Sequence, residues 1–338
     1  MYITATNFAE KGVVKQFMSE IVWQSTGGIA ALAFLYYGAE FLVKGGVAIA
    51  KKLHVSSLVI GLTLVACATS APELVVSMEG AWKGLGGIAL GNVVGSNICN
   101  IALILGCSAL VRPLTVHKDL FKWDVPIMVL SALLLALITI FTGGLGRIAG
   151  GVFLLFLIIY TVVNIRSARK NELAKLSAPA NEEKKEENEK ETKLFSAIFF
   201  CILGLGLLIA GGKFLVESAV FFAGKLGVSQ AVIGLTVVAV GTSLPELATS
   251  MVAAFKGEED IAIGNVVGSN IFNILGIMGI APLISPFTSS GIGIMDMGWL
   301  IALSLLLVPL MYTGWKISRK EGGFLLLAYI VYITLLIK

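Results

Sequence analysis

The stretch Gly61-Leu-Thr-Leu-Val-Ala-Cys-Ala-Thr-Ser-Ala-Pro-Glu-Leu74 occurs a second time as Gly234-Leu-Thr-Val-Val-Ala-Val-Gly-Thr-Ser-Leu-Pro-Glu-Leu247, with ten of the fourteen positions identical. A second pair follows, Gly91-Asn-Val-Val-Gly-Ser-Asn-Ile-Cys-Asn100 and Gly264-Asn-Val-Val-Gly-Ser-Asn-Ile-Phe-Asn273. Both pairs are separated by 173 positions, so the chain is a duplicated unit. Each unit has one glutamate directly after a proline in a strongly apolar segment.

The composition places this duplication in a membrane. Of the 338 residues, 57% are hydrophobic and only 14% are charged, whereas about 25% of the residues in a soluble domain are charged. Several apolar runs approach the ~20 residues that a helix needs to span a bilayer. The net charge of +4 says little until the basic residues are assigned to loops. The composition therefore predicts a multi-pass membrane protein and argues against a soluble fold.

We predict an all-α membrane protein with ten transmembrane helices in two inverted five-helix repeats. An odd number of helices in each repeat reverses the orientation of the second copy, as in many transporters. The expected domains are an N-terminal lead-in (1–20), the first repeat (21–166), a charged linker (167–193) and the second repeat (194–338). The helices are expected at 22–44, 57–82 (broken at Pro72), 85–110, 122–141, 147–166, 194–220, 230–255 (broken at Pro245), 261–284, 297–315 and 322–337.

Lysine and arginine residues indicate the orientation of these helices. With the linker placed inside, seventeen of the 25 basic residues fall in inside segments, six fall outside and two lie within helices. Cytoplasmic loops are enriched in Lys and Arg, so we expect a multi-pass protein of the cell membrane with a cytoplasmic linker and both termini outside. A solvated linker is favoured over a calcium-sensing loop, because it lacks the glycine turn and spaced ligands of such a loop.

Glu73 and Glu246 are the most informative residues. A charged residue at the centre of a membrane helix costs at least about 2.5 kcal/mol, so two acids at equivalent positions indicate a function. In the first copy, Ser70, Glu73 and Ser77 share one helical stripe, because they lie on successive turns.

The second motif supplies neutral oxygen atoms. Asn92, Ser96 and Asn100 are spaced four residues apart and share a face, and the second copy repeats this pattern. Carboxylate, hydroxyl and carbonyl oxygens are ligands of hard cations such as Ca²⁺. The glycines of each Gly-x-x-x-Gly permit close approach of helices. Asn97 and Asn270 point off the stripe, and helix packing with polar contacts is the alternative to a functional role there and at the glycines.

Softer metals are not indicated. Zn²⁺ and similar ions favour His and Cys ligands, but the two histidines, His54 and His117, lie in predicted loops. No cysteine has metal-ligand spacing, and we expect small buried hydrophobic side chains at all four: Cys67, Cys99, Cys107 and Cys201.

Two inverted bundles would bring Glu73 and Glu246 together near the middle of the membrane. Two close carboxylates repel each other unless positive charge lies between them. One Ca²⁺, two Na⁺ or two protons would each neutralise the pair. Such a site is typical of an exchanger, in which either of two kinds of bound cation neutralises the same carboxylates.

The doubled pattern resembles the repeats of the sodium/calcium exchanger family, within the cation/calcium exchanger superfamily, and the compact size is similar to its prokaryotic branch. The resemblance covers essentially the whole membrane part. It implies ten transmembrane helices, with four core helices around the ions and with the first and sixth helices sliding over that core. It also implies the ion-lining positions Ala66, Thr69, Ser70, Glu73, Ser96, Asn100, Ala239, Thr242, Ser243, Glu246, Ser269 and Asn273. Among these, we expect Ca²⁺ at Glu73, Glu246, Thr69 and Thr242.

The chain departs from the family pattern at two positions. Ala68 stands where the family usually has glycine, and Asn273 stands where some prokaryotic and the potassium-dependent exchangers have Asp. Asn273 leaves two carboxylates in the site, which weakens the case for potassium co-transport. The Gly-Asn-Ala-x-Glu pattern of the proton-coupled branch is absent, which favours Na⁺ over H⁺.

We therefore predict an antiporter that exchanges Ca²⁺ for Na⁺ by alternating access, with Ca²⁺/H⁺ antiport as the alternative and a passive cation channel as a third hypothesis. We expect Ca²⁺, Na⁺ and the lipid bilayer as partners, no nucleic acid and no cofactor, and the sequence contains no catalytic nucleophile–base pair. Two intrahelical ion pairs, with the order of their signs swapped between the copies, are possible gates: Glu40 with Lys44 and Lys213 with Glu217.

Overall fold

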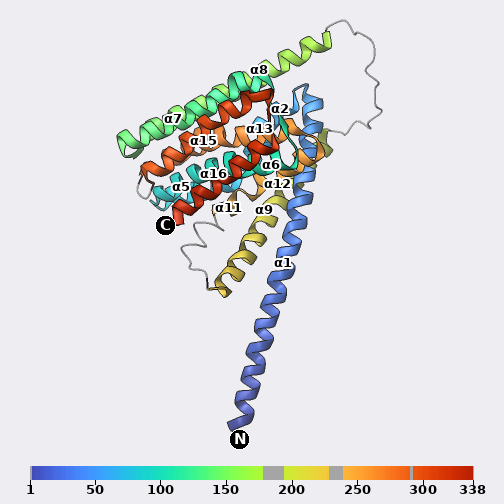
Figure 1. The fold of residues 1–338 in the computed structure, drawn as a ribbon, viewed down its shortest axis with the longest axis vertical. Helices are drawn as coiled ribbons and strands as arrows, with labels where there is room; N and C mark the ends of the chain where they lie inside the picture. Colours follow the sequence, from blue (N-terminus) through green and yellow to red (C-terminus); the bar gives the residue numbers. More distant parts are fainter. Residues whose placement is uncertain (1, 178–193, 228–238, 290–291, 338) are drawn as a thin grey trace.

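The computed structural model describes residues 2–177, 194–227, 239–289 and 292–337. Helices packed as a bundle make up almost all of it, which agrees with the predicted all-α class, and the N-terminal part of α1 extends beyond the bundle (Figure 1). The α-helices are α1 (Tyr2–Leu53), α2 (Ser57–Ile60), α3 (Ala66–Thr69), α4 (Ala71–Trp82), α5 (Gly86–Cys99), α6 (Leu105–Val111), α7 (Val125–Thr142), α8 (Arg147–Ser177), α9 (Leu194–Lys225), α11 (Ala239–Thr242), α12 (Leu244–Lys256), α13 (Glu259–Ile271), α14 (Met278–Ile284), α15 (Ile294–Tyr312) and α16 (Arg319–Ile337).

Short π-helical turns join several of these helices into longer continuous segments. They are η1 (Gly61–Val65), η2 (Asn100–Ile104), η3 (Leu120–Asp124) and η5 (Phe272–Ile277), and a 3₁₀ turn, η6 (Thr313–Trp315), follows α15. The turns η2 and η5 occupy corresponding places in the two copies of the second motif. π-Turns inside α-helices occur frequently at functional sites.

Within the described residues, seven segments are long and apolar enough to cross a membrane, and the bent pair Ser57–Thr69 and Ala71–Trp82 would make an eighth. The predicted multi-pass membrane architecture agrees with these spans. Part of the predicted helix at 230–255 lies outside the described residues, so the count of ten stays a prediction.

Two of the spans form the centre of the bundle. Gly86–Val111 and Glu259–Ile284, which contain the two copies of the second motif, are each 78% buried, whereas the other five are 17–44% buried. Glycines allow this central packing. A Cβ atom on Gly264 would lie 2.8 Å from the main-chain oxygen of Leu58, so the predicted role of these glycines in close helix approach is confirmed for the second copy.

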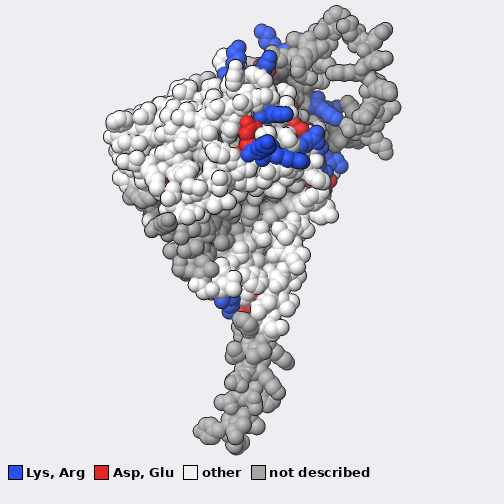
Figure 2. Space-filling view, in the orientation of Figure 1, with Lys and Arg blue, Asp and Glu red and all other residues white. Residues whose placement is uncertain are grey.

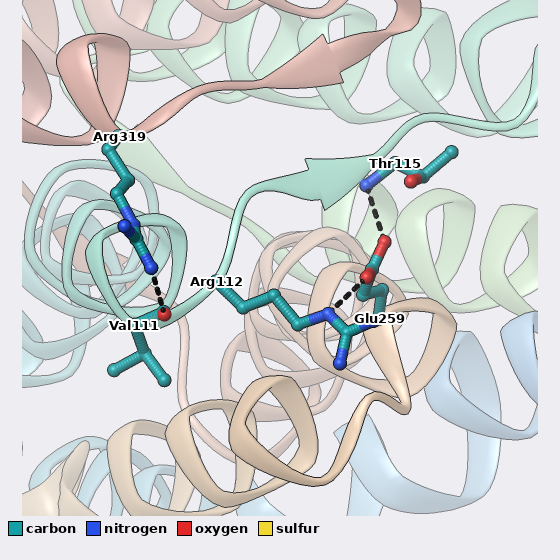
Figure 3. Close-up of polar contacts among 5 residues, drawn as sticks. All are labelled: Val111, Arg112, Thr115, Glu259 and Arg319. Carbon is teal, nitrogen blue, oxygen red and sulfur yellow. Dashed lines mark hydrogen bonds and ion pairs between the residues drawn. The ribbon is translucent and has the colours of Figure 1, made fainter.

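Charged side chains gather at one end of the bundle, near α2, α6 and α13 (Figure 2). There, Glu259 accepts hydrogen bonds from Arg112 Nε at 2.6 Å and from the main-chain nitrogen of Thr115 at 3.1 Å, and Arg319 donates to the main-chain oxygen of Val111 at 3.3 Å (Figure 3). These contacts fasten α6, α13 and α16 to one another at this end.

Two pairs of very short strands tie the loops of the two copies together. β1 (Leu114–Thr115) pairs antiparallel with β4 (Lys316–Ile317), and β2 (Gly144–Leu145) pairs antiparallel with β3 (Phe287–Thr288). The sequence did not predict these strands, because two residues show no hydrophobic periodicity.

α1 begins at Tyr2, within the expected lead-in at 1–20, and α8 continues to Ser177, into the expected linker; residues 178–193 of that linker lie outside the description, and the division into domains stays a prediction. The expected burial of the cysteines needs correction. Cys67 is exposed on the surface of the bundle rather than buried, and Cys107 and Cys201 are half-buried. An apolar side chain on a membrane helix can face lipid as well as protein, so hydrophobicity alone does not predict burial.

α1 and α9 lie side by side along much of their length (Figure 1). They approach closely at several glycines, including Gly38 and Gly204. A Cβ atom on Gly38 would lie 2.9 Å from the main-chain oxygen of Gly204, and one on Gly204 would lie 2.6 Å from that of Gly38. Because the obstructing atoms belong to the backbone, a side chain at either position forces the helices apart.

Gly204→Ala is therefore expected to destabilise the purified protein by about 1–3 kcal/mol, the usual cost of overpacking. Gly206→Ala is the matched control on the same helix, because nothing lies within 4 Å of a Cβ atom there; it should leave stability unchanged or raise it, since Ala is the better helix former. Thermal unfolding in detergent measures both. Equal melting temperatures for the two variants would contradict the close crossing.

Candidate functional site

Each repeated glutamate lies in the first turn of a helix that follows a break. Ser70, with φ −81° and ψ 9°, separates α3 from α4, and the two parts of this segment are bent by 47°. Pro72 then lies in the first turn of α4, where its missing N–H would have had no helical partner. The break thus falls two residues before the predicted position at Pro72.

The second copy has the same local structure. Ser243, with φ −89° and ψ 9°, separates α11 from α12, and Pro245 and Glu246 lie in the first turn of α12. A helix N-terminus carries partial positive charge, which favours a carboxylate there. Both glutamates therefore receive electrostatic stabilisation from their own helices.

The serine at each break bonds to the glutamate of the other copy. Ser70 Oγ donates to Glu246 Oε1 at 2.9 Å, and Ser243 Oγ donates to Glu73 Oε1 at 3.0 Å. Ser96 Oγ lies 3.5 Å from the same Oε1 of Glu73 and 3.3 Å from Ser243 Oγ. This reciprocal arrangement brings the two halves of the chain together around the two acids.

Several polar atoms at this place have no hydrogen-bond partner among the described residues. They include Oε2 of both glutamates and the amide oxygen and nitrogen of Asn100 and Asn273, and all four residues are at most 1% exposed. Buried polar groups almost always have a partner. Free carboxylate and amide oxygens in an enclosed place can coordinate a hard cation.

The asparagines that open the second motif bridge neighbouring helices. Asn92 Nδ2 donates to the main-chain oxygen of Glu73 at 3.1 Å and to Ser77 Oγ at 2.9 Å. Asn265 Nδ2 makes the equivalent bonds to the main-chain oxygen of Glu246 at 3.4 Å and to Ser250 Oγ at 2.9 Å. The helix that carries each glutamate is thus fixed to the helix that carries the second motif.

The remaining predicted positions lie around this network. Thr69 Oγ1 is 3.3 Å from the main-chain oxygen of Ala66 and 3.1 Å from Asn265 Oδ1, and Ser269 Oγ is 3.5 Å from that same oxygen of Ala66. Thr242 is half-buried at the end of α11. Ala239 begins α11, but its side chain lies outside the described residues.

Of the two predicted ion pairs at the gate residues, the structure contains the pair in the second copy but not the pair in the first copy. Glu40 Oε1 lies 2.6 Å from Lys256 Nζ at the end of α12, while Lys44 Nζ lies 5.0 Å from the centre of the Phe200 ring. The predicted Glu40–Lys44 pair is therefore wrong, because residues distant in sequence offer both side chains nearer partners. Lys213 and Glu217 do form the predicted intrahelical pair, at 3.9 Å.

The two copies also share an aspartate that was not identified from the sequence. Asp124, which is buried, accepts hydrogen bonds from the Tyr160 hydroxyl at 2.8 Å and from Asn164 Nδ2 at 2.9 Å. Tyr332 lies 3.4 Å from Asp296 in the other copy. Both aspartates precede their tyrosine by 36 positions, and this shared spacing would have revealed them. These pairs fasten the end of η3, directly before α7, to α8, and α15 to α16.

No group of three or more His, Cys, Asp or Glu that could hold a metal ion occurs among the described residues. His117 Nε2 lies 2.8 Å from Asp260, away from the glutamates. An ion between Glu73 and Glu246 would therefore take its other ligands from neutral oxygens. Such a donor set fits Ca²⁺ or Na⁺ better than a transition metal.

Known proteins resemble this chain over most of its length. A family model described as sodium/calcium exchanger protein matches residues 25–166 and 196–338. The sodium/calcium exchanger MaX1 of Methanosarcina acetivorans is 38% identical, over 91% of this chain and 97% of that protein. The inner membrane protein YrbG of Escherichia coli is 37% identical, over 76% of this chain and 79% of that protein.

The fold is also similar to a solved structure of the sodium-calcium exchanger NCX_Mj soaked with zero Na⁺ and Ca²⁺. The TM-score is 0.79 at 33% sequence identity, and the match covers 94% of this chain and 99% of that one. These matches agree with the doubled motifs and their buried glutamates, and they show that the chain belongs to the sodium/calcium exchanger family, whose members are secondary transporters rather than enzymes.

Proposed function

We propose that this protein exchanges Ca²⁺ for Na⁺ across the cell membrane by alternating access. Membership of the family establishes a cation/Ca²⁺ antiporter, and the choice of Na⁺ as counter-ion is our proposal. The observation that supports an exchange site is the reciprocal bonding of Ser70 and Ser243 to the glutamates. It leaves one oxygen of each carboxylate free of partners among the described residues. Two such oxygens can share one divalent or two monovalent cations.

We further propose that the site is built from inverted repeats, residues 21–166 and 194–338, with ten transmembrane helices in total. Equivalent bonds in the two copies support this arrangement, since Asn92 and Asn265 have the same partners 173 positions apart. The charged end of the bundle in Figure 2 is assigned to the cytoplasmic side because Lys and Arg favour that side. The linker is then cytoplasmic and both termini are outside.

In this proposal Ca²⁺ lies between Glu73 and Glu246, with Thr69 and Thr242 as further ligands. The other ligands come from the remaining predicted positions: Ala66, Ser70, Ser96, Asn100, Ala239, Ser243, Ser269 and Asn273. Ca²⁺ takes six to eight oxygens, which this set can supply. Na⁺ would use the same carboxylates, so the two ions exclude each other by charge and the exchange is coupled.

Vesicles that contain the purified protein test the choice of counter-ion. Ca²⁺ uptake should follow an outward Na⁺ gradient and should persist when a protonophore removes any pH gradient. Uptake that ignores Na⁺ and follows the pH gradient would replace the proposal with Ca²⁺/H⁺ antiport. Ca²⁺ current in discrete single-channel steps would instead establish a channel.

Glu73→Gln and Glu246→Gln should each reduce exchange in the same assay by at least about 30-fold, because loss of one partner from a buried charge interaction costs ~2 kcal/mol or more. Glu79→Gln is the matched control, since Glu79 lies on the same helix as Glu73 but is exposed and forms an ion pair with Lys83. It should retain normal exchange. Robust coupled transport by either site variant would refute a shared two-carboxylate site.

Ser70→Ala and Ser243→Ala should each weaken apparent Ca²⁺ affinity by about tenfold or more, because hydrogen bonds to charged groups contribute roughly 1.5–3 kcal/mol. Ser108→Ala is the control, because Ser108 is equally buried and its hydroxyl has no partner among the described residues. Its affinity should change less than twofold. Titration of the uptake rate with Ca²⁺ gives the affinities. Equal losses of affinity in Ser70→Ala and Ser108→Ala would refute a role of the serine–glutamate bonds in Ca²⁺ binding.

We also propose that the Glu40–Lys256 pair holds α1 against the end of α12 in one of the two transport conformations. Glu40→Lys should change the exchange rate by up to about fivefold, since a partly exposed ion pair contributes ~1 kcal/mol or less. The charge swap Glu40→Lys with Lys256→Glu should restore the rate to within about twofold. Glu79→Lys, in an exposed pair within α4, should have little effect, and a swap that fails to restore the rate would exclude the Glu40–Lys256 contact as a gate.

A further inference from the structure

We propose that Asn265 is a positioning residue that orients the Thr69 hydroxyl and thereby sets the ion affinity, and that Asn92 positions Glu73 in the other copy. This inference rests on the proposed function, because it takes Thr69 and the two glutamates as ion ligands. Neither asparagine is expected to contact the ion.

The bonds of Asn265 determine which way its amide points. Its side chain is completely buried, and one amide atom faces the main-chain oxygen of Glu246 at 3.4 Å and Ser250 Oγ at 2.9 Å. A carbonyl oxygen can only accept, so this amide atom must be the nitrogen. The amide oxygen is then the atom that lies 3.1 Å from Thr69 Oγ1, and Thr69 must be the donor.

This direction of donation matters for a cation. A hydroxyl has one proton and two lone pairs, so a hydroxyl that donates to Asn265 presents only lone pairs to the ion. Without Asn265, the proton of Thr69 would turn to another acceptor beside it, such as the Glu246 carboxylate or the main-chain oxygen of Ala66, which is already 3.3 Å away. That oxygen is itself a proposed ligand, so loss of Asn265 would disturb two ligands together.

The bond also crosses between the two copies of the motif. Thr69 lies at the end of α3 in the first copy, whereas Asn265 lies on α13 in the second. Asn265 in addition bonds the main-chain oxygen of Glu246, so one amide links the backbone at Glu246 in the second half to a hydroxyl of the first half. Outer-shell partners of this kind orient metal ligands, and their loss typically lowers affinity 10- to 100-fold.

Burial alone does not explain these asparagines. Asn97 and Asn270 are amides of the same helices and are as deeply buried. Asn97 Nδ2 donates within its own helix to the main-chain oxygen of Val93 at 2.8 Å, and Asn270 Nδ2 contacts Met128 Sδ at 3.7 Å. Neither bonds to a glutamate or to a proposed ligand, so they serve as matched controls.

The test uses the purified full-length protein and the rise in its melting temperature with added Ca²⁺ to obtain a dissociation constant. Asn265→Ala and Thr69→Val should each weaken Ca²⁺ binding about 10- to 100-fold, and Asn270→Ala should leave it within about twofold of the wild type. Because both side chains act through one bond, the double variant should be within about twofold of the weaker single variant. Thr69→Ser keeps the hydroxyl and should restore most of the affinity.

Two outcomes would overturn the inference. A lower melting temperature of Asn265→Ala with an unchanged Ca²⁺ dissociation constant would make Asn265 a purely structural residue. Alternatively, the losses of the two single variants could multiply in the double variant, which would show that they act independently. Asn92→Ala tests the other copy at a half-buried position, and unchanged Ca²⁺ affinity there would overturn the positioning of Glu73 by Asn92. If Asn265→Ala does not fold, unchanged Ca²⁺ affinity of Thr69→Val, which removes the other partner of the same bond, would overturn the role of Asn265.

Binding and exchange are separate measurements, so failure of the proposed function can be distinguished. Wild-type protein that binds Ca²⁺ but does not exchange it for Na⁺ would refute the exchanger and leave the positioning role intact. Normal exchange by the wild type with unaltered Ca²⁺ binding by Asn265→Ala would refute only the positioning role.

Discussion

The rest of the structure depends on one constraint, the burial of two carboxylates at the centre of an apolar bundle. Neither glutamate is solvated, since Glu73 and Glu246 are both fully buried. Each is stabilised by the N-terminus of its own helix and by a hydroxyl donated from the other copy of the motif. A buried charge without such partners would cost several kcal/mol, so neither half of the chain can provide a suitable site alone.

Small residues make the close approach of the two halves possible. Gly264 packs against the backbone at Leu58, and Gly38 and Gly204 bring α1 and α9 into backbone contact. Between helices in a membrane, packing and hydrogen bonds replace the hydrophobic effect as the driving force. The asparagines Asn92 and Asn265 supply those hydrogen bonds next to the glutamates, which places rigid structure directly behind the carboxylates.

The contacts of α1 are of two kinds. Its apolar side chains, such as Leu42 and Ile49, are buried in the core, and Glu40 forms an ion pair with Lys256 of α12 in which both side chains are partly exposed. Partly exposed ion pairs contribute little and can be exchanged readily. The Glu40–Lys256 pair can therefore be broken at a smaller cost than the buried bonds to the glutamates.

The sequence by itself determined the helical membrane class, the duplication, the identity of the buried acids and the residue types around them, because hydropathy and a repeat at constant spacing are local properties of the chain. It placed the helix breaks two residues late, since Pro72 and Pro245 are tolerated in the first turn of a helix. Only the tertiary structure decided that Ser70 bonds to Glu246 and that Ser243 bonds to Glu73. It also decided that Glu40 pairs with Lys256 and not with Lys44, and that Cys67 is exposed. Those choices join residues far apart in the sequence or depend on which face of a helix meets another. Hydrophobic periodicity predicts neither the contacts between distant residues nor which helix face is buried, because both depend on how the helices pack together.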